Sequence, residues 1–113
     1  MEASNLANLL LDVERYEDAR SVARKTMPAA RRVLGESHAD TLRLRWSYAR
    51  ALFLDDSATL DDLREAATTL EETERTARRV LGAAHPMTVG LEQALRISRA
   101  ALRFCETPLG NAY

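Results

Sequence analysis

One phrase occurs twice in this chain of 113 residues. "RRVLGESHADT", residues Arg31–Thr41, returns as "RRVLGAAHPMT", residues Arg78–Thr88, at an offset of 47 positions. The same offset places "YEDA" (Tyr16–Ala19) on "LREA" (Leu63–Ala66). Self-similarity with a period of about 40 residues indicates stacked supersecondary units, because one such unit cannot bury its apolar face alone. The repeat therefore predicts an array of similar units.

The copies differ by an insertion. "NLANLL" (Asn5–Leu10) matches "SYARAL" (Ser47–Leu52) at an offset of 42, so the second unit carries five extra residues within Phe53–Asp62. A spacer of unequal length indicates a loop. The predicted organisation is one domain and a flexible tail: a domain at 1–104, with units at about 1–38, 39–85 and 86–104, and a tail at 105–113.

Hydrophobic periodicity predicts that the units are built from helices. Between Leu60 and Leu81 the apolar and small residues mostly recur at intervals of three and four positions, which is typical of an amphipathic helix. Ser57 or Thr59 is expected to cap its start, and Gly82 to end it. The chain as a whole predicts five helices: 3–14, 16–34, 39–54, 60–81 and 86–104.

Two residue types give local expectations for these helices. Gly35 and Gly82 follow the repeated "RRVL", so each is expected to form a left-handed C-terminal cap. Pro28 lies inside the second helix, where a proline costs about 3 kcal/mol, so we expect a kink between Arg24 and Pro28.

Composition excludes several classes of protein. The hydrophobic share of 46% and the charged share of 29%, with four Gly and three Pro, favour a soluble helical chain. Sixteen basic and seventeen acidic residues argue against a nucleic-acid surface. No segment reaches the roughly 20 apolar residues of a membrane span. Cys105 is the single cysteine, and the start "MEASNLANLLLDVER" lacks the pattern of a signal peptide, so a reducing, cytoplasmic location is expected.

The units resemble the tetratricopeptide repeat. "NLANLL…RYEDA" carries a large residue followed by a small one at Leu6-Ala7, and an alanine at Ala19, as that family does. The phrase "RVLGxxHxxT" is similar to the longer repeats of the kinesin light chain type. The resemblance covers about Asn5 to Arg99 and implies an all-α, right-handed α-α superhelix of about two and a half helical hairpins. Arg96 departs from the family, because a small residue is expected there, and this favours a terminal cap.

The resemblance also implies a peptide-binding groove on the concave side, lined by the first helix of each unit. The candidate groove residues are Asn5, Asn8, Arg43, Trp46, Ser47, Arg50 and Gln93, with Gly90 and Ile97 in register. Asn5 matches a family asparagine that bonds a peptide backbone, and Ser47 departs from it. Arg43 and Arg50 suit a carboxylate, because a guanidinium donates two parallel hydrogen bonds. An acidic or C-terminal carboxylate peptide is the expected ligand.

Each of these residues has a second interpretation. Arg43 and Arg50 are equally read as solvated charges on a helix face. Trp46 is more readily packed against the preceding helix, about 16–34, than presented as a binding anchor, although tryptophan is enriched at binding hot spots.

The two histidines are expected to have a structural and not a catalytic role. His38 and His85 are repeat equivalents, so they should lie one unit apart, too far to share a metal ion. We expect each imidazole to bond to the backbone of its connector, with a ligand or acid-base role as the alternative. Ser47, Ser57 and Cys105 are not framed by any catalytic motif, and the glycines are scattered. No enzymatic activity, cofactor or metal site is expected.

Three functional hypotheses follow. The first is a non-enzymatic protein-interaction module that binds a peptide in its groove. The second is a structural or self-associating subunit that stacks through its ends, using the apolar residues Leu6, Leu9, Leu10, Val13, Leu95, Leu102 and Phe104. The third is a regulatory module whose insertion carries Asp55, Asp56, Asp61 and Asp62 to a basic partner. Light scattering across a concentration series separates the first two hypotheses.

Overall fold

The chain folds into helices throughout the part that the structure describes. The computed structural model describes the backbone of residues 2–12 and 15–106, and the side chains of 6–11 and 15–105. The helices are α1 (Glu2–Asp12), α2 (Tyr16–Leu34), α3 (Ala39–Leu54), α4 (Leu60–Leu81) and α5 (Pro86–Glu106). This confirms the all-α fold and the five expected helices. The bounds of α2, α3 and α4 are those expected from the repeat, and α5 continues two residues beyond Phe104.

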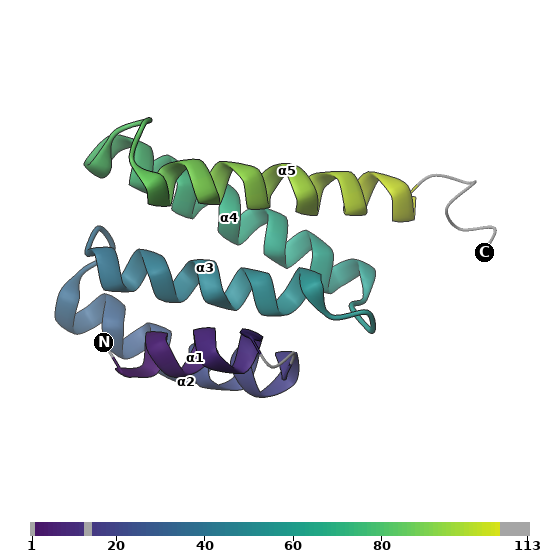
Figure 1. Ribbon diagram of the computed structural model, residues 1–113, viewed down its shortest axis with the longest axis horizontal. Coiled ribbons are helices and arrows are strands. Elements are labelled where there is room, and N and C mark those ends of the chain that lie inside the picture. Colours follow the sequence, from purple (N-terminus) through teal and green to yellow (C-terminus); the bar gives the residue numbers. More distant parts are fainter. Residues whose placement is uncertain (1, 13–14, 107–113) are drawn as a thin grey trace.

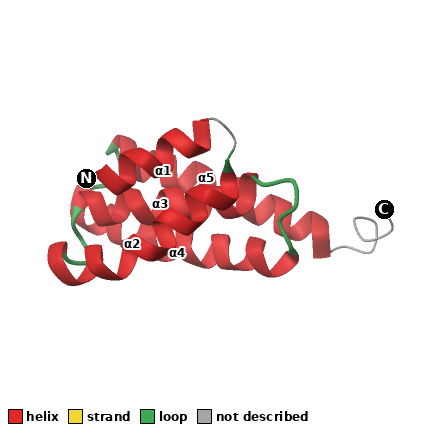
Figure 2. Cartoon of the chain, turned by 90° about the horizontal axis from the view of Figure 1, so that it is seen from below, coloured by secondary structure: helices red, strands yellow, loops and turns green. Residues whose placement is uncertain are grey.

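The helices form a stack of two layers. Figure 1 shows them stacked in chain order, with α1 and α2 at one end and α5 at the other. In Figure 2, α1, α3 and α5 form one layer, and α2 and α4 form the other. Each helix packs on its neighbours along the chain, and α1 and α5 also contact α3, whereas the backbones of α2 and α4 stay apart and the two helices meet through an ion pair of Arg20 with Asp62 at 3.6 Å. The first helices of the three units therefore share one side of the molecule.

The core is centred on α3, which is covered from both sides. Nine of its sixteen residues are buried. Leu42, Leu44 and Leu52 lie in a cluster with Leu70 of α4 and Leu91 of α5. A smaller cluster joins Leu11, Ala19 and Ala51, where the first unit meets α3. The repeat thus stacks in the expected way, because each hairpin buries the apolar face of its neighbour.

Side-chain caps and glycines define the helix ends. Thr59 caps α4: its hydroxyl accepts from the Asp62 amide at 3.1 Å, and Asp62 accepts from the Thr59 amide at 3.1 Å. Of the two expected caps, Thr59 is the one used. Gly35 and Gly82 end their helices at φ +96° and +95°, but with ψ near 160°. The expected left-handed helical cap is therefore wrong in detail, since both glycines take an extended conformation that only glycine adopts readily.

The remaining expectations concern Pro28 and the chain ends. Helix α2 runs unbroken through Pro28, and the kink expected there stays a prediction. Arg96 and Arg99 of α5 are exposed, whereas their repeat equivalents Ala49 and Leu52 are buried. This observation fits the expected terminal cap. Of the expected tail, Cys105 is helical, and residues 107–113 lie outside the described part of the chain.

Candidate functional site

A pocket of about 440 Å³ lies between α3 and α5. Its lining comes from two repeat-equivalent helices: Trp46, Arg50, Phe53, Leu54, Gly90, Gln93, Ala94 and Ile97. Three of the candidate groove residues, Trp46, Arg50 and Gln93, are therefore brought together, and both residues expected in register with them also line the pocket. The wall of the pocket is mainly apolar.

Trp46 and Gly90, which both line the pocket, are in direct contact. A Cβ atom built on Gly90 would lie 2.4 Å from Cη2 and 2.7 Å from Cζ2 of Trp46, so the indole lies directly against the backbone of α5. Packing against the preceding helix was expected and stays a prediction, and the contact with α5 was not foreseen. The reason is local: the absent side chain at Gly90 leaves space on the following helix that a large ring fills.

Arg50 is the charged residue among the described residues that line this pocket. Its side chain is partly exposed, and it has no hydrogen bond or ion pair with any residue that the structure describes. A guanidinium beside an apolar wall binds carboxylates in a fixed, bidentate geometry. Gln93 adds an exposed amide on the facing helix. The pocket thus combines one cation, one amide and an apolar surface.

Asn8 and Ser47 bond to each other instead of facing a ligand. The Ser47 hydroxyl donates to the Asn8 side-chain oxygen at 2.6 Å, and Ser47 is only 2% exposed. The pair ties α1 to α3 across the first two units. The sequence assigned both residues to the groove, and the structure places neither of them in the lining of the α3–α5 pocket.

Arg43 and Asn5 also lie away from the pocket lining. Arg43 belongs to the second turn of α3 and pairs with Asp40 at 2.8 Å, one turn earlier on the same helix. The solvated interpretation of Arg43 fits this contact. The Asn5 side chain lies outside the described residues. Of the two arginines assigned to the groove, only Arg50 lines the α3–α5 pocket.

The two histidines cap the helices that follow them. Nδ1 of His38 accepts from the Asp40 amide, and Nδ1 of His85 accepts from the Met87 amide, each at 3.1 Å. The carbonyls of both histidines accept the first helical hydrogen bonds, from Leu42 and Val89. The expected bond from imidazole to backbone is confirmed. It also explains why the connector repeats its histidine: the phrase ends one helix at glycine and starts the next.

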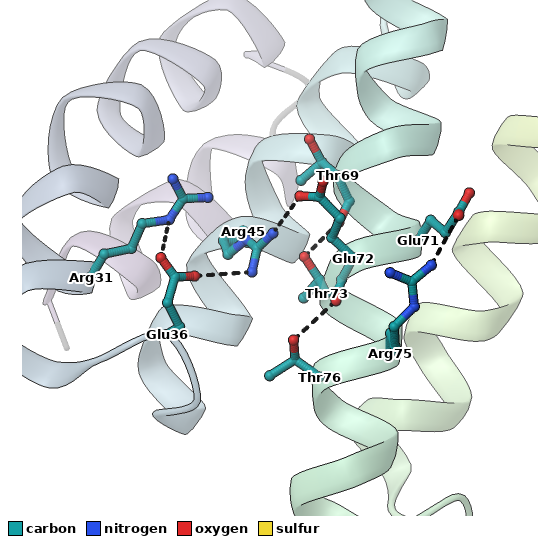
Figure 3. A network of polar contacts seen from close by, with 9 residues as sticks. All are labelled: Arg31, Glu36, Arg45, Thr69, Glu71, Glu72, Thr73, Arg75 and Thr76. Carbon is teal, nitrogen blue, oxygen red and sulfur yellow. Dashed lines mark hydrogen bonds and ion pairs between the residues drawn. The ribbon is translucent and has the colours of Figure 1, made fainter.

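A buried arginine was missed by the sequence analysis. Arg45 is 4% exposed and lies between Glu36 of the connector, at 3.4 Å, and Glu72 of α4, at 3.2 Å. Figure 3 shows its guanidinium between these two carboxylates, with Arg31 bonded to Glu36 from the other side. Burial lowers the pKa of Arg45. No signal in the chain distinguishes this arginine from the exposed ones, because only the stacking of α3 on α4 encloses it.

Tyr48 joins the first and second units through a second polar group. Arg24 of α2 donates to the Tyr48 hydroxyl at 3.0 Å, and that hydroxyl donates to Glu65 of α4. Burial raises the pKa of Tyr48, and the hydrogen bond to Tyr48 raises the pKa of Arg24. This group links α2 and α4 through Tyr48 of α3.

Two acidic residues of the insertion accept hydrogen bonds from the backbone of the same loop. Asp55 accepts from the Ser57 amide at 2.9 Å, and Asp62 belongs to the cap of α4. The side chain of Asp61 lies 3.6 Å from Arg64 and is 93% exposed. The role of this loop in binding a basic partner stays a prediction.

The described residues contain no group of three His, Cys, Asp or Glu side chains that could hold a metal ion. Within the same part of the chain, no helix is long and apolar enough to cross a membrane.

Comparison with known proteins identifies the first unit. The family model of the tetratricopeptide repeat matches residues 3–40, which span α1, α2 and the first connector. The first unit is therefore similar to that repeat. Comparisons with curated proteins and with solved structures gave no match. Repeats of this family generally mediate protein–protein interactions and are typically non-enzymatic.

Proposed function

We propose that this chain is a non-enzymatic protein-interaction module that binds an acidic peptide segment of a partner in the pocket between α3 and α5. The observation that carries the proposal is Arg50, a guanidinium without an ion pair to any described residue, in a pocket whose other lining residues apart from Gln93 are apolar. Trp46 and Gln93 add an aromatic surface and an amide to the same pocket. The sequence alone had assigned these three residues to one groove.

The repeat type is part of the same proposal. The connector carries glycine, histidine and threonine at fixed positions in both copies, and its histidines cap α3 and α5. This use of the phrase supports repeats of the kinesin light chain type. The expected cytoplasmic location stays a prediction.

Fluorescence anisotropy of a labelled peptide tests the proposal. The probe is a short peptide of alternating glutamate and alanine, with acetylated and amidated ends, and its control has glutamine in place of glutamate. We expect the acidic peptide to bind, the glutamine peptide to bind at least about tenfold more weakly, and added salt to weaken the acidic complex. Equal affinity for both peptides, or no binding of either, would refute a carboxylate site.

Matched variants locate the site. Arg50→Gln is expected to lower the affinity for the acidic peptide about tenfold, because it removes a charge-assisted hydrogen bond. Arg32→Gln is the control: Arg32 is exposed in the last turn of α2 and has no ion pair with a described residue. If both variants lose affinity equally, the chain binds the peptide through its overall charge and not in the pocket.

Self-association through the N-terminal end is the second candidate. Leu6 and Leu9 of α1 are 45% and 58% exposed, whereas their repeat equivalents Tyr48 and Ala51 are 3% and 1% exposed. In the second unit a preceding hairpin covers this position. Among the other residues assigned to the ends, Leu95 is buried and Leu10 packs against the smaller cluster, so neither supplies a free surface. Phe104 is exposed, Leu102 is partly exposed, and Val13 lies outside the described residues.

Light scattering tests this second candidate. A self-associating chain should gain mass with concentration, and Leu9→Ser should remove that gain. Val33→Ser is the matched control, because Val33 is 74% exposed on α2. A monomeric mass at all concentrations would exclude assembly of the isolated chain.

A further inference from the structure

The indole nitrogen of Trp46 is enclosed by protein and has no acceptor among the described residues. A tryptophan has one polar atom, and leaving that donor buried without a partner costs about 1–3 kcal/mol. Native structures keep few such groups, and each of them needs a physical explanation. The orphaned donor belongs to a residue that lines the α3–α5 pocket.

The indole that carries this donor lies at the smaller of the two contacts that α3 makes with α1 and α5. The indole edge next to the N–H, Cζ2, lies against Gly90. Helix α5 contacts α3 less extensively than α1 does. For the N–H to reach a peptide carbonyl, α3 and α5 must separate slightly, and the direct contact between these two helices is small. Gly90 permits this motion, because it has no side chain that interlocks with the ring.

The residue of the third unit that is equivalent to Trp46 also carries a side-chain donor. Trp46 and Gln93 are equivalent at the offset of 47, and both line the pocket. The second and third units thus both carry a side-chain N–H group at this register. Asn5, which the family resemblance assigns to a peptide backbone, has its side chain outside the described residues, and its repeat equivalent Ser47 is bonded to Asn8. A bound peptide needs donors for its main-chain carbonyls as well as a cation for its carboxylate.

We infer that Trp46 donates its indole N–H to a main-chain carbonyl of a peptide bound between α3 and α5, while Arg50 holds the carboxylate. This inference rests on the proposed function, because it assigns a role to another residue of the same pocket. It makes Trp46 a binding residue through its N–H and not only through its apolar ring. Binding then satisfies a donor that is unsatisfied in the free protein.

The indole cross-peak in a ¹⁵N–¹H correlation spectrum reports this bond directly. Trp46 is the only tryptophan, so the spectrum has one indole signal. On addition of the glutamate–alanine peptide to the full chain, we expect the indole proton to move downfield and its hydrogen exchange with solvent to slow. At saturating peptide the same shift should occur in the Arg50→Gln variant, because the main chain and not the carboxylate accepts the bond. Loss of the shift there would overturn the main-chain assignment.

A substitution gives an independent measure. Trp46→Phe keeps an aromatic ring and removes the donor, so the affinity should fall about tenfold. Phe53→Leu, which changes an apolar wall residue without removing a donor, is the control and should change affinity less. If the wild-type peptide binds but the indole signal does not move, the inference fails and the proposed function stands. If no peptide binds, both fail.

Discussion

His38 and His85 show how one residue type can fix a repeat. Each imidazole accepts a main-chain amide through Nδ1 at the start of a helix, in the position where Ser, Thr, Asp or Asn is usual. We expect His85→Ala to lower the free energy of unfolding by about 1 kcal/mol, and His85→Asn to keep most of it, because asparagine also accepts in this position. Urea denaturation measures both. An Asn variant as unstable as the Ala variant would contradict the capping role.

Glu92 gives the chain an acid-sensitive contact. The carboxylate accepts from Arg96 on its own helix and from Arg78 of α4 at 3.2 Å, and the bond from Arg96 lowers its pKa. A carboxyl with a depressed pKa stabilises the fold above its unfolded value of about 4.3, and this contribution is lost as the pH falls through the lower folded value. Glu92→Gln should therefore lose less thermal stability than the wild type between about pH 5 and pH 3.

The control for this pH effect is Glu17→Gln. Glu17 is exposed on α2 and has no ion pair with a described residue. Thermal unfolding at about pH 5 and pH 3 measures the effect. Between these pH values the melting temperature should fall less for Glu92→Gln than for Glu17→Gln. Equal drops in the two variants would mean that Glu92 does not stabilise the fold through its charge.

At the scale of the helices, Gly90 sets the distance between α3 and α5. A methyl group at this position would overlap the indole of Trp46 at 2.4 Å, and overpacking of this kind costs about 1–3 kcal/mol. We expect Gly90→Ala to be destabilised although alanine favours helices. Combining it with Trp46→Leu should recover part of the loss, since a smaller side chain leaves room for the methyl group. Denaturation of the four variants of this cycle measures the coupling, and additive effects would contradict the contact.

Arg45 is the ionic contact between the first connector and α4. It is buried, but its partners Glu36 and Glu72 have side chains that are 59% and 57% exposed. Removing the arginine leaves two carboxylates that water can solvate. We therefore expect Arg45→Met, which keeps the volume, to stay within about 1 kcal/mol of the wild type. Arg45→Ala should lose about 2 kcal/mol or more, because it opens a cavity. If both variants lose a similar amount of unfolding free energy, the positive charge of Arg45 and not its volume stabilises the fold.

At the scale of the whole molecule, the period of the sequence predicted the helices and not the contacts between them. The glycines and the 47-residue offset gave the bounds of α2, α3 and α4, because helix ends depend on local chemistry. The direction of Trp46, the bond between Ser47 and Asn8 and the burial of Arg45 depend on how adjacent units stack. That stacking varies with side-chain size at single positions such as Gly90, which a repeat pattern treats as equivalent to Arg43 of the preceding unit.

A stack in which contacts are mostly between neighbours is expected to open from its ends. Helix α3 packs against all four other helices, whereas α1 packs only against α2 and α3 and leaves Leu6 and Leu9 exposed. Native-state hydrogen exchange should therefore give the highest protection in α3 and α4, at the global free energy of unfolding. Amides of α1 should exchange through a local opening that costs less free energy than global unfolding. Leu11→Ala, at the contact of α1 with Ala51, should accelerate exchange in α1 while leaving α4 nearly unchanged. Uniform acceleration across all helices would mean that the units unfold as one cooperative body.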